Sequence, residues 1–535
     1  MNDATLAAAF EDWRRELGAD AVLDGAAAEA RHGACTMATR RRILGAIAPA
    51  DADAVRRAVL VAGRHRVALY PFSTGHNWGY GSAHPARDDC VLVDLSRLDR
   101  VIEFDRELGI VTLEPGVTQR ALREFLDARD AEYLVPVHGG GPTCSLLGNA
   151  LERGYGITPH TDHFAAVMAL EAVLANGETY RTPLTLQGAG LADRVFKWGT
   201  GPYLDGLFTQ GAFGIVTRMS IALAPRPEST MAFFFGVRED AELEAITERV
   251  QRVLRRTQGV AGSVNLMNRR RVLSMMVPYP EGVPAQAVIS DDQVAQLGRA
   301  NQVMAWTGAG ALYGQRRVVA AAVAEVKAAL RPLARRLLFV SAPRLARVRA
   351  LTRFVPGFAT SKFGNVLATF DKTLQLLGGA PSEIALPLAY WRVPQRRPAQ
   401  GDLDPARDGC GLIWYAPLVP MKPALVRTYT GFVDSVCRKH GIEPLITLTS
   451  LSERCFDSTV PLLFDARDEA AVARARACYD ELRDGGRALG FLPYRSSVDA
   501  MGAVVQVDTP YWRMVRDFKA AVDPDNLIAP GRYAP

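Results

Sequence analysis

The sequence predicts an α+β fold built as two packed domains, and three observations carry that prediction. The chain has 535 residues, which is too long for one ordinary hydrophobic core. Hydrophobic residues make up 48% and charged residues 22% of the chain, as in globular proteins. Near residue 225 the pattern changes from short strands with glycine-rich turns to longer helices with short strands. We therefore expect a first domain at residues 1–225, a second at 226–485 and a C-terminal segment at 486–535.

The first domain is expected to place helices and strands around glycine-rich turns. Residues 50–66 begin with acidic side chains and space apolar residues three and four apart, which is typical of an amphipathic helix. A second helix is expected at residues 119–129. Short apolar runs predict strands at residues 67–71, 91–95, 110–114, 169–174 and 214–223. Glycine clusters lie between these strands, at residues 73–81, 138–142 and 148–156.

The second domain is expected to have its own sheet with helices outside it. Helical patterns cover residues 241–255, 316–338 and 422–440, and short β-rich pieces separate them. A polar loop that contains proline is expected at residues 393–409. The tail at residues 523–532 has the composition of a helix end followed by an ordered turn.

Charge and cysteine content exclude several classes of protein. The net charge of +6 is small for this length, and the basic runs at residues 40–42 and 269–271 are best explained as solvated helix faces, so no nucleic-acid partner is expected. Seven cysteines without a CxxC pair indicate neither a disulfide framework nor a metal site. The N-terminus does not resemble a signal peptide, and no apolar run reaches the ~18 residues of a membrane span. We expect a soluble, cytoplasmic protein without a membrane partner.

The glycine turns point to a ligand of extended shape. Neither G-x-G-x-x-G nor G-K-[ST] occurs, so the common dinucleotide and P-loop signatures are absent from the sequence. Glycine lets the backbone approach a phosphate closely and turn its N–H groups inward. One such turn would indicate only a turn, but three in one domain favour a ligand that lies along all of them. Composition does not identify that ligand.

An ordered set of segments carries a resemblance to a known family. The segments span nearly the whole chain and lie at residues 73–81 (STGHNWGYG), 113–118 (LEPGVT), 147–154 (LGNALERG), 158–164 (TPHTDHF), 171–177, 197–208, 214–217, 414–417, 493–495 and 526–532. Together they resemble the vanillyl-alcohol oxidase / p-cresol methylhydroxylase family of FAD-dependent oxidoreductases. The resemblance implies a two-domain FAD-binding fold, with an α+β cap domain over the flavin and a C-terminal segment that completes the FAD site.

The resemblance also implies which residues bind the cofactor. The loop at residues 73–77 would hold the pyrophosphate through backbone N–H groups. The implied cofactor-binding residues are Ser73, Thr74, Gly75, His76, Asn77, Pro115, Gly116, Gly140, Gly141, Gly148, Asn149, Glu152, Arg153, Gly154, Gly214, Ile215, Val216 and Arg532. A homodimer, a small-molecule substrate and either oxygen or a cytochrome as electron acceptor are implied in the same way.

Three positions match those that grip a phenolate in this family, namely Tyr80, Tyr494 and Arg495. A phenol has a pKa near ~10, and a guanidinium beside its oxygen favours the anion. Two tyrosine hydroxyls can donate to that anion. The resemblance implies that the phenolate then releases hydride from the para benzylic carbon to flavin N5, which gives a quinone methide. Packing in a turn and a surface strand with a snorkelling arginine are the structural alternatives for these residues.

Asp162 matches an acidic residue that lies near flavin N5 in the family, where it would assist proton transfer. An Asx-type turn or a cap after Pro159 is the structural alternative for this side chain.

The cap departs from the family pattern at several positions. The histidine that carries the flavin in the oxidase branch falls on Leu412, and the tyrosine anchor of the hydroxylase branch falls on Ala389, with Tyr390 one place on. A histidine pair is replaced around residues 455–457, and an expected acidic residue appears as Thr447. His76 stands where a related class of flavoenzymes bonds the flavin, so a covalent link through His76 or Tyr390 is possible, whereas Cys144 is better explained as a buried structural thiol.

The lost cap residues keep alternative functions open. The same FAD fold could act on a non-phenolic alcohol, amine or hydroxy acid. A non-catalytic flavin protein is a third hypothesis, and the retention of Tyr80, Asp162, Tyr494 and Arg495 argues against it.

Overall fold

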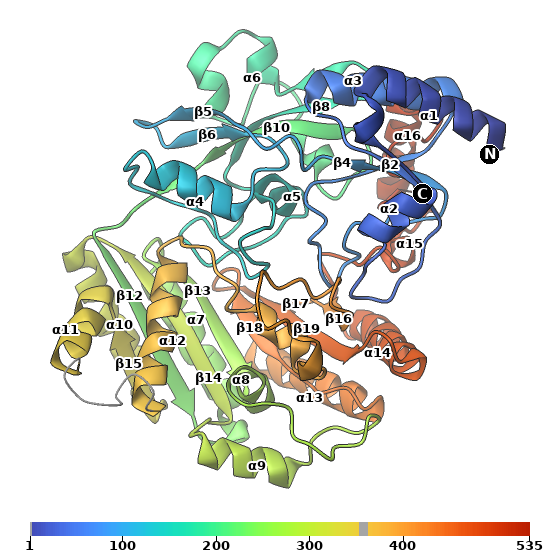
Figure 1. Cartoon of the computed structure of the whole chain (residues 1–535). Coiled ribbons are helices and arrows are strands. Elements are labelled where there is room, and N and C mark those ends of the chain that lie inside the picture. Colours follow the sequence, from blue (N-terminus) through green and yellow to red (C-terminus); the bar gives the residue numbers. More distant parts are fainter. Residues whose placement is uncertain (1–2, 353–361, 535) are drawn as a thin grey trace.

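The structure is a computed structural model that describes residues 3–352 and 362–534. Figure 1 shows two lobes, one above the other in the view, with both chain termini on the upper lobe. Three smaller sheets, of four, five and two strands, belong to the first lobe, and one eight-stranded sheet belongs to the second. No helix among the described residues is long and apolar enough to cross a membrane.

A four-stranded sheet with a parallel centre begins the first lobe. Its order is β1-β2-β4-β3, with β1 at Val22–Asp24, β2 at Ile43–Ile47, β4 at Cys90–Asp94 and β3 at Leu69–Phe72. Helices α1 (Asp3–Leu17), α2 (Gly25–His32) and α3 (Ala52–His65) accompany it. Asp51 begins α3 by accepting a hydrogen bond from the Ala54 N–H. The buried stripe of α3 packs on the sheet, and Trp13 of α1 donates its indole N–H to the Ala58 carbonyl at 3.0 Å.

A five-stranded antiparallel sheet completes the core of this lobe. Its order is β5-β6-β10-β8-β9, with bounds Val101–Asp105, Ile110–Leu113, Ile215–Ala222, Val167–Val173 and Thr179–Arg181. Thr118 caps α4 (Gln119–Asp127), whose apolar face packs against the sheet together with α5 (Leu146–Leu151). The short strands β7 (Tyr133–Leu134) and β11 (Ala224–Pro225) pair beside it, and the short helix α6 (Pro183–Leu186) follows β9.

The eight-stranded sheet, which we call the cap sheet, is antiparallel throughout. Its order is β15-β12-β14-β13-β18-β19-β16, and β17 also pairs with β19. The bounds in that order are Arg336–Val340, Ser229–Val237, Trp306–Gly314, Ala261–Asn268, Thr447–Ser450, Cys455–Asp465 and Cys410–Tyr415, with β17 at Leu418–Pro420. The helices of this part of the chain are α7 (Leu243–Arg256), α8 (Arg269–Met276), α9 (Asp291–Ala300), α10 (Arg316–Leu330), α11 (Ala342–Thr352), α12 (Lys362–Leu377), α13 (Pro423–Lys439) and α14 (Glu469–Ala488).

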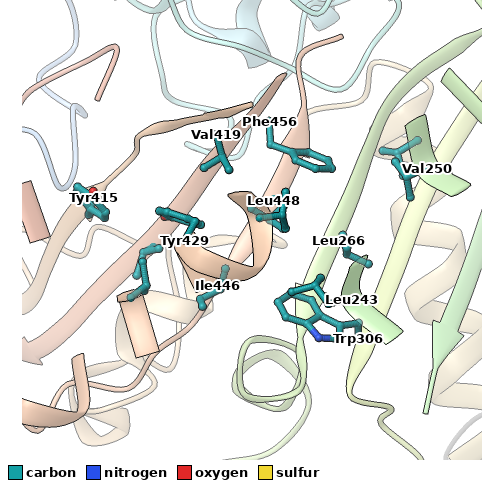
Figure 2. Packing of buried hydrophobic residues seen from close by; sticks show 14 of the residues in the cluster. Leu243, Val250, Leu266, Trp306, Tyr415, Val419, Tyr429, Ile446, Leu448 and Phe456 are labelled. Carbon is teal, nitrogen blue, oxygen red and sulfur yellow. The ribbon is translucent and has the colours of Figure 1, made fainter. Parts of the chain in front are cut away.

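One face of the cap sheet is apolar and packs under helices. Leu266, Leu448 and Phe456 from three neighbouring strands meet Val250 of α7 and Tyr429 of α13 in one buried cluster (Figure 2). Side chains alternate between the two faces of a strand. The residues beside these core positions therefore point to the opposite face of the sheet, toward the first lobe.

The C-terminal segment returns to the first lobe. Its helices α15 (Met501–Val504) and α16 (Pro510–Val522) lie beside that lobe in Figure 1. The Leu69 N–H donates to the Leu527 carbonyl and the Ala529 N–H donates to the Leu69 carbonyl, each at 2.7 Å, so the tail extends the edge of β3. The buried Lys519 ammonium joins this turn by donating to Asp523 and to the Ala212 carbonyl, each at 2.5 Å. The boundaries at residues 225 and 485 stay a prediction.

Most expected elements form within a few residues of their expected bounds, but two expectations are wrong. The helix expected at residues 316–338 ends at Leu330, because Pro332 has no N–H to continue it, and residues 336–340 form the edge strand β15 instead. Neither basic run is a solvated helix face. Residues 40–42 lie outside any helix, just before β2, and Arg41 forms an ion pair with Asp499 at 2.6 Å. Arg270 is buried and forms ion pairs with Glu443 and Asp291, each at 2.7 Å.

Candidate active site

A cavity of about 890 Å³ lies where the loops of the first lobe meet the cap sheet. The first lobe lines it with the residues that follow β3, with the segment around His138 and with α5. The cap lines it with β12, β13, β14, β16, β18 and β19, and the C-terminal segment adds Arg495, Val498 and Arg532. The cavity is therefore built from all three parts of the chain. No cluster of metal-binding side chains occurs among the residues that the structure describes.

The loop after β3 has the backbone of an anion site. It begins at the carboxyl end of β3, which pairs in parallel with β4. Gly75 adopts a positive φ of 73° that turns the chain. The N–H groups of residues 74–77 donate to no acceptor in the described part of the chain. A Cβ at Gly148 would lie 3.0 Å from the Ser73 hydroxyl, so the neighbouring turn also approaches this loop closely. Backbone N–H groups without partners, in a loop that lines the cavity, fit a pyrophosphate.

A buried ion-pair network fixes the tail to this wall. Glu152 accepts a hydrogen bond from Arg532, and the Arg495 Nε lies 3.3 Å from its other carboxylate oxygen. Burial alone would raise the pKa of Glu152, but the cations of Arg532 and Arg495 outweigh it and hold that pKa below its usual value. Two guanidinium groups thus share one carboxylate, which leaves one positive charge for an anionic ligand.

Most of the predicted cofactor-binding residues line the cavity. These are Ser73, Thr74, Gly75, His76, Asn77, Gly140, Gly148, Asn149, Glu152, Gly154, Gly214, Val216 and Arg532.

Five others lie behind the lining and support it. The Pro115 carbonyl accepts the Ser145 hydroxyl at 2.6 Å, and a Cβ at Gly116 would lie 2.3 Å from the Ser96 carbonyl oxygen. Arg153 donates to the Thr209 hydroxyl at 3.0 Å, and Ile215 packs in the apolar core. Gly141 has a positive φ of 95° beside Leu386.

The candidate covalent anchors differ in position. His76 lines the cavity, stacks on Trp78 with ring centroids 5.0 Å apart, and places its Nδ1 3.1 Å from the Thr143 hydroxyl. Tyr390 does not line the cavity; it is buried and donates its hydroxyl to Asp408 at 2.6 Å. The cavity positions near it are Ala389 and Leu412, which cannot bond a flavin. Cys144 is a buried free thiol, and burial raises its pKa to about 12.

The three predicted phenol-binding residues meet in the cavity. The Arg495 guanidinium carbon lies 4.1 Å from the centroid of the Tyr80 ring, and its Nη2 donates to the Asn77 side chain. The Val498 N–H donates to the Tyr80 carbonyl at 2.9 Å, so the tail also holds this tyrosine. Tyr494 packs edge-on against Tyr155 with centroids 5.8 Å apart. Neither tyrosine hydroxyl has a hydrogen-bond partner in the described chain, so both can donate to a ligand.

Asp162 does not line the cavity. Its Oδ1 accepts the Ala165 N–H at 3.0 Å, and the residue forms an isolated bridge with Tyr155, which does line the cavity. The structure thus places Asp162 behind the lining, where its side chain caps the N–H three residues on, as in the structural alternative for this residue.

Sequence reasoning missed three polar residues of the cavity. Asp457 of β19 is buried, its Oδ1 has no hydrogen-bond partner, and burial raises its pKa to about 7. His138 accepts the Gly140 N–H on Nδ1, and its buried Nε2 has no partner; burial and the Arg495 charge lower its pKa to about 4. Arg271 of α8 lines the cavity without a carboxylate within ion-pair distance in the described residues. Strand alternation beside the core residue Phe456 could have indicated Asp457.

Comparisons with known proteins match this geometry. A family model described as an FAD binding domain matches residues 43–183. The 1'-carboxy-chondrochloren decarboxylase of Chondromyces crocatus is 36% identical over 537 residues, which cover 100% of this chain and 98% of the relative. The flavoprotein subunit of the 4-cresol dehydrogenase (hydroxylating) of Pseudomonas putida is 26% identical over 489 residues, covering 91% and 87% of the two chains.

The chain belongs to the vanillyl-alcohol oxidase / p-cresol methylhydroxylase family. The 4-ethylphenol oxidase from Gulosibacter chungangensis superposes with a TM-score of 0.88 at 22% identity, covering 100% of this chain and 98% of that one. This likeness confirms the predicted two-domain FAD-binding fold with an α+β cap. Membership in the family makes the chain an FAD-dependent oxidoreductase. The N–H groups of residues 74–77, which have no partner in the described chain, fit its pyrophosphate.

Proposed function

We propose that this oxidoreductase acts on a para-substituted phenol at the benzylic carbon. The observation that carries the proposal is the convergence of Tyr80, Tyr494 and Arg495 on one cavity, with both hydroxyls unpartnered and the guanidinium beside them. Such a set stabilises a phenolate oxygen by charge and by two hydrogen bonds. A surface strand would not bury these groups together.

The residues of the chain then have defined tasks. Bound FAD supplies an acceptor for two electrons and a proton, that is, for hydride. Arg495 and the two tyrosines hold the phenol oxygen and favour its anion, which increases electron density at the para position. The apolar lining, including Leu412 and Trp414, excludes water from the ring. The benzylic carbon loses hydride and becomes a quinone methide, which water or loss of a further proton converts to product.

Anaerobic flavin reduction tests the proposal. A 4-alkylphenol or 4-hydroxybenzyl alcohol should bleach the flavin absorbance of the purified holoenzyme. Arg495→Ala should reduce the rate of bleaching by about 10²–10³-fold, the usual effect of removing one charge-stabilising donor. Arg454→Ala, which removes an exposed arginine of the cap, is the control and should keep the wild-type rate. If none of these phenols bleaches the flavin, the proposal is wrong.

A second candidate activity is oxidative decarboxylation of a phenol whose side chain carries a carboxylate. The decarboxylase named above matches the full chain, and Arg271 offers the cavity an unpaired cation; burial lowers the pKa of this guanidinium to about 10. After hydride loss, the bond to the carboxylate can break and its electron pair can form a new double bond as the ring regains aromaticity, with release of CO₂. A phenol with such a side chain should release CO₂ in step with flavin bleaching, and Arg271→Gln should raise its KM while a neutral 4-alkylphenol keeps its KM.

His76 is proposed as the attachment point if the flavin is covalently bound, because it lines the cavity while Tyr390 does not. After denaturation in SDS and electrophoresis, a fluorescent protein band in the wild type that is absent in His76→Ala would support this link. The same band in both proteins would contradict it.

The electron acceptor, a homodimer and a cytoplasmic location remain predictions. Reoxidation of the bleached enzyme by oxygen, compared with reoxidation by a cytochrome c, distinguishes the two acceptors.

A further inference from the structure

We propose that Asp457 is the group that takes the proton from the hydroxyl of the bound phenol. This inference rests on the proposed phenol oxidation and assigns it a proton acceptor that the family resemblance did not supply.

The position of Asp457 in β19 directs its side chain into the cavity. The residue pairs with Leu418 on one side and Thr449 on the other, so its backbone is held in the middle of the cap sheet. Its chain neighbour Phe456 points into the apolar core, and Asp457 therefore points to the opposite face. The residue is only 6% exposed, and neither carboxylate oxygen accepts a hydrogen bond within the described chain. A buried carboxyl without partners is costly unless a ligand or a proton occupies it.

The groups that face Asp457 include several phenolic hydroxyls and one cation. Tyr80, Tyr155, Tyr494 and Arg495 line the same cavity as Asp457 and interact with it electrostatically. Cys455 of its own strand and Tyr429 of α13 also interact with it electrostatically. Burial raises the pKa of Asp457, and the charge of Arg495 offsets this only in part. Arg495 is already shared with Glu152, which explains why it does not fully stabilise a second carboxylate.

The other carboxylate and the imidazole groups that line the cavity are weaker bases, whereas its thiol, phenol and guanidinium groups keep their protons at neutral pH. Glu152 is held ionised by two cations, so its pKa lies below its usual value. Burial lowers the pKa of His138 to about 4, and it also lowers the pKa of His76. Asp457 is therefore the side chain in the described lining whose proton affinity is matched to neutral pH.

The proton transfer keeps the charge of the site constant. An ionised Asp457 and a phenolate would repel each other in the same buried space. When the phenol O–H bond breaks, its electron pair stays on the phenol oxygen, and the proton forms an O–H bond on the Asp457 carboxylate. The resulting carboxylic acid is neutral, and the positive charge of Arg495 then stabilises the phenolate instead of the carboxylate. Hydride then leaves the benzylic carbon with two electrons.

The pH dependence of anaerobic flavin reduction tests this assignment. With a 4-alkylphenol, the wild-type rate should rise with pH and level off with a midpoint near 7, where Asp457 ionises. In Asp457→Asn the midpoint should move up by at least about one pH unit toward the phenol's own pKa, and the rate near neutral pH should fall about 100-fold. Asp457→Glu should keep a midpoint close to neutral. Asp292→Asn, which changes an exposed carboxyl of α9, is the control.

Two outcomes of this experiment overturn the assignment. Asp457→Asn could keep the wild-type midpoint and rate, or Asp162→Asn could shift the midpoint when Asp457→Asn does not. If no phenol bleaches the wild type at any pH, the proposed phenol oxidation itself fails, which is a separate result.

A binding experiment on the wild-type holoenzyme does not depend on how the variants fold. The probe is 4-chlorophenol, which has no benzylic carbon. At about pH 8 it should bind as phenolate, seen in the ultraviolet difference spectrum, without net release of protons to a weakly buffered solution, because Asp457 retains the proton. Release of one proton per bound ligand, or binding as the neutral phenol, would overturn the proposal.

Thermal unfolding supplies a readout that is independent of the reaction. Because the pKa of Asp457 is raised in the folded protein, its stabilising effect is fully present below about pH 4 and is lost as the pH rises through about 7. The Tm of Asp457→Asn relative to wild type should therefore be higher at pH 8.5 than at pH 5. The opposite trend would show that the carboxylate is well partnered and is not the proposed base.

Discussion

The wall of the cavity that the first lobe forms and the wall that the cap sheet forms differ in how their residues are distributed along the sequence. The first wall takes five consecutive positions, Ser73 to Asn77, from a single loop after β3. This loop offers mainly backbone N–H groups to a ligand. The cap wall takes one to three residues from each of six strands, β12, β13, β14, β16, β18 and β19, among them Asn265, Thr449 and Asp457.

This difference determines how sensitive each wall is to substitution. A backbone site depends on the course of the chain, so a substitution changes it only where the turn requires glycine. A strand face is changed by any single substitution at an inward position without loss of the fold. The cap wall of this chain has Thr447 where the family resemblance led us to expect an acidic residue. Its Asp457 lies in the segment 455–457, which replaces an expected histidine pair.

Breaking the ion-pair network behind the first wall should have the largest effect. Glu152→Gln leaves Arg532 and Arg495 buried without their shared carboxylate, which should cost about 3–5 kcal/mol of unfolding free energy and most of the bound FAD. Thermal unfolding and the ratio of flavin to protein absorbance measure both. Glu248→Gln, an exposed glutamate of α7, is the control, and equal flavin content in the two variants would contradict the prediction.

The second largest loss of stability is expected when the contact between the two walls is disrupted. Gly79 has φ of 77°, and a Cβ there would lie 2.2 Å from the Trp414 ring of the cap sheet. Gly79→Ala should therefore lower the unfolding free energy by about 2–4 kcal/mol, from overpacking together with backbone strain. Gly282→Ala is a matched control, because its φ is also 77° but no atom lies within 4 Å of its Cβ. Equal destabilisation by the two substitutions would show that the cap contact is unimportant.

The same contrast determines how much could be predicted from the sequence. The first wall was easy to predict from the glycine turns and from the ordered set of segments that resembles the family. Residues 73–77 are adjacent in the sequence, so a local pattern is enough to identify them. The positions of Asp162 and Tyr390 were not predictable, because whether a side chain enters a cavity or bonds to Ala165 or Asp408 depends on packing. The apolar spacing continues past residue 330, and only the missing N–H of Pro332 signals the end of α10 there.

Asp457 and Arg271 illustrate the remaining gap in prediction. Each lies next to residues with a plain structural role, the core residue Phe456 and the ion-paired Arg270, and the sequence assigns no chemistry to either position. Asp457 and Arg271 stand out because the carboxyl lacks a hydrogen-bond partner and the guanidinium lacks an ion-pair partner among the described residues. This can be recognised only once strands β13, β18 and β19 and helix α8 lie together in three dimensions.

The smallest effects are expected from the two tyrosines that reach the phenol oxygen from opposite parts of the chain. Tyr80→Phe and Tyr494→Phe each remove one hydrogen bond to a charged oxygen, worth about 1.5–3 kcal/mol, or roughly 10–100-fold in the rate of flavin reduction. Because both hydroxyls donate to the same anion, the double variant should lose less than the product of the single losses. The rates of flavin bleaching by a saturating 4-alkylphenol in the wild type, the two single variants and the double variant measure this non-additivity in a double-mutant cycle. Strictly multiplicative losses would show that the tyrosine from the first lobe and the tyrosine from the C-terminal segment act on different atoms, and the shared phenolate site would then be wrong.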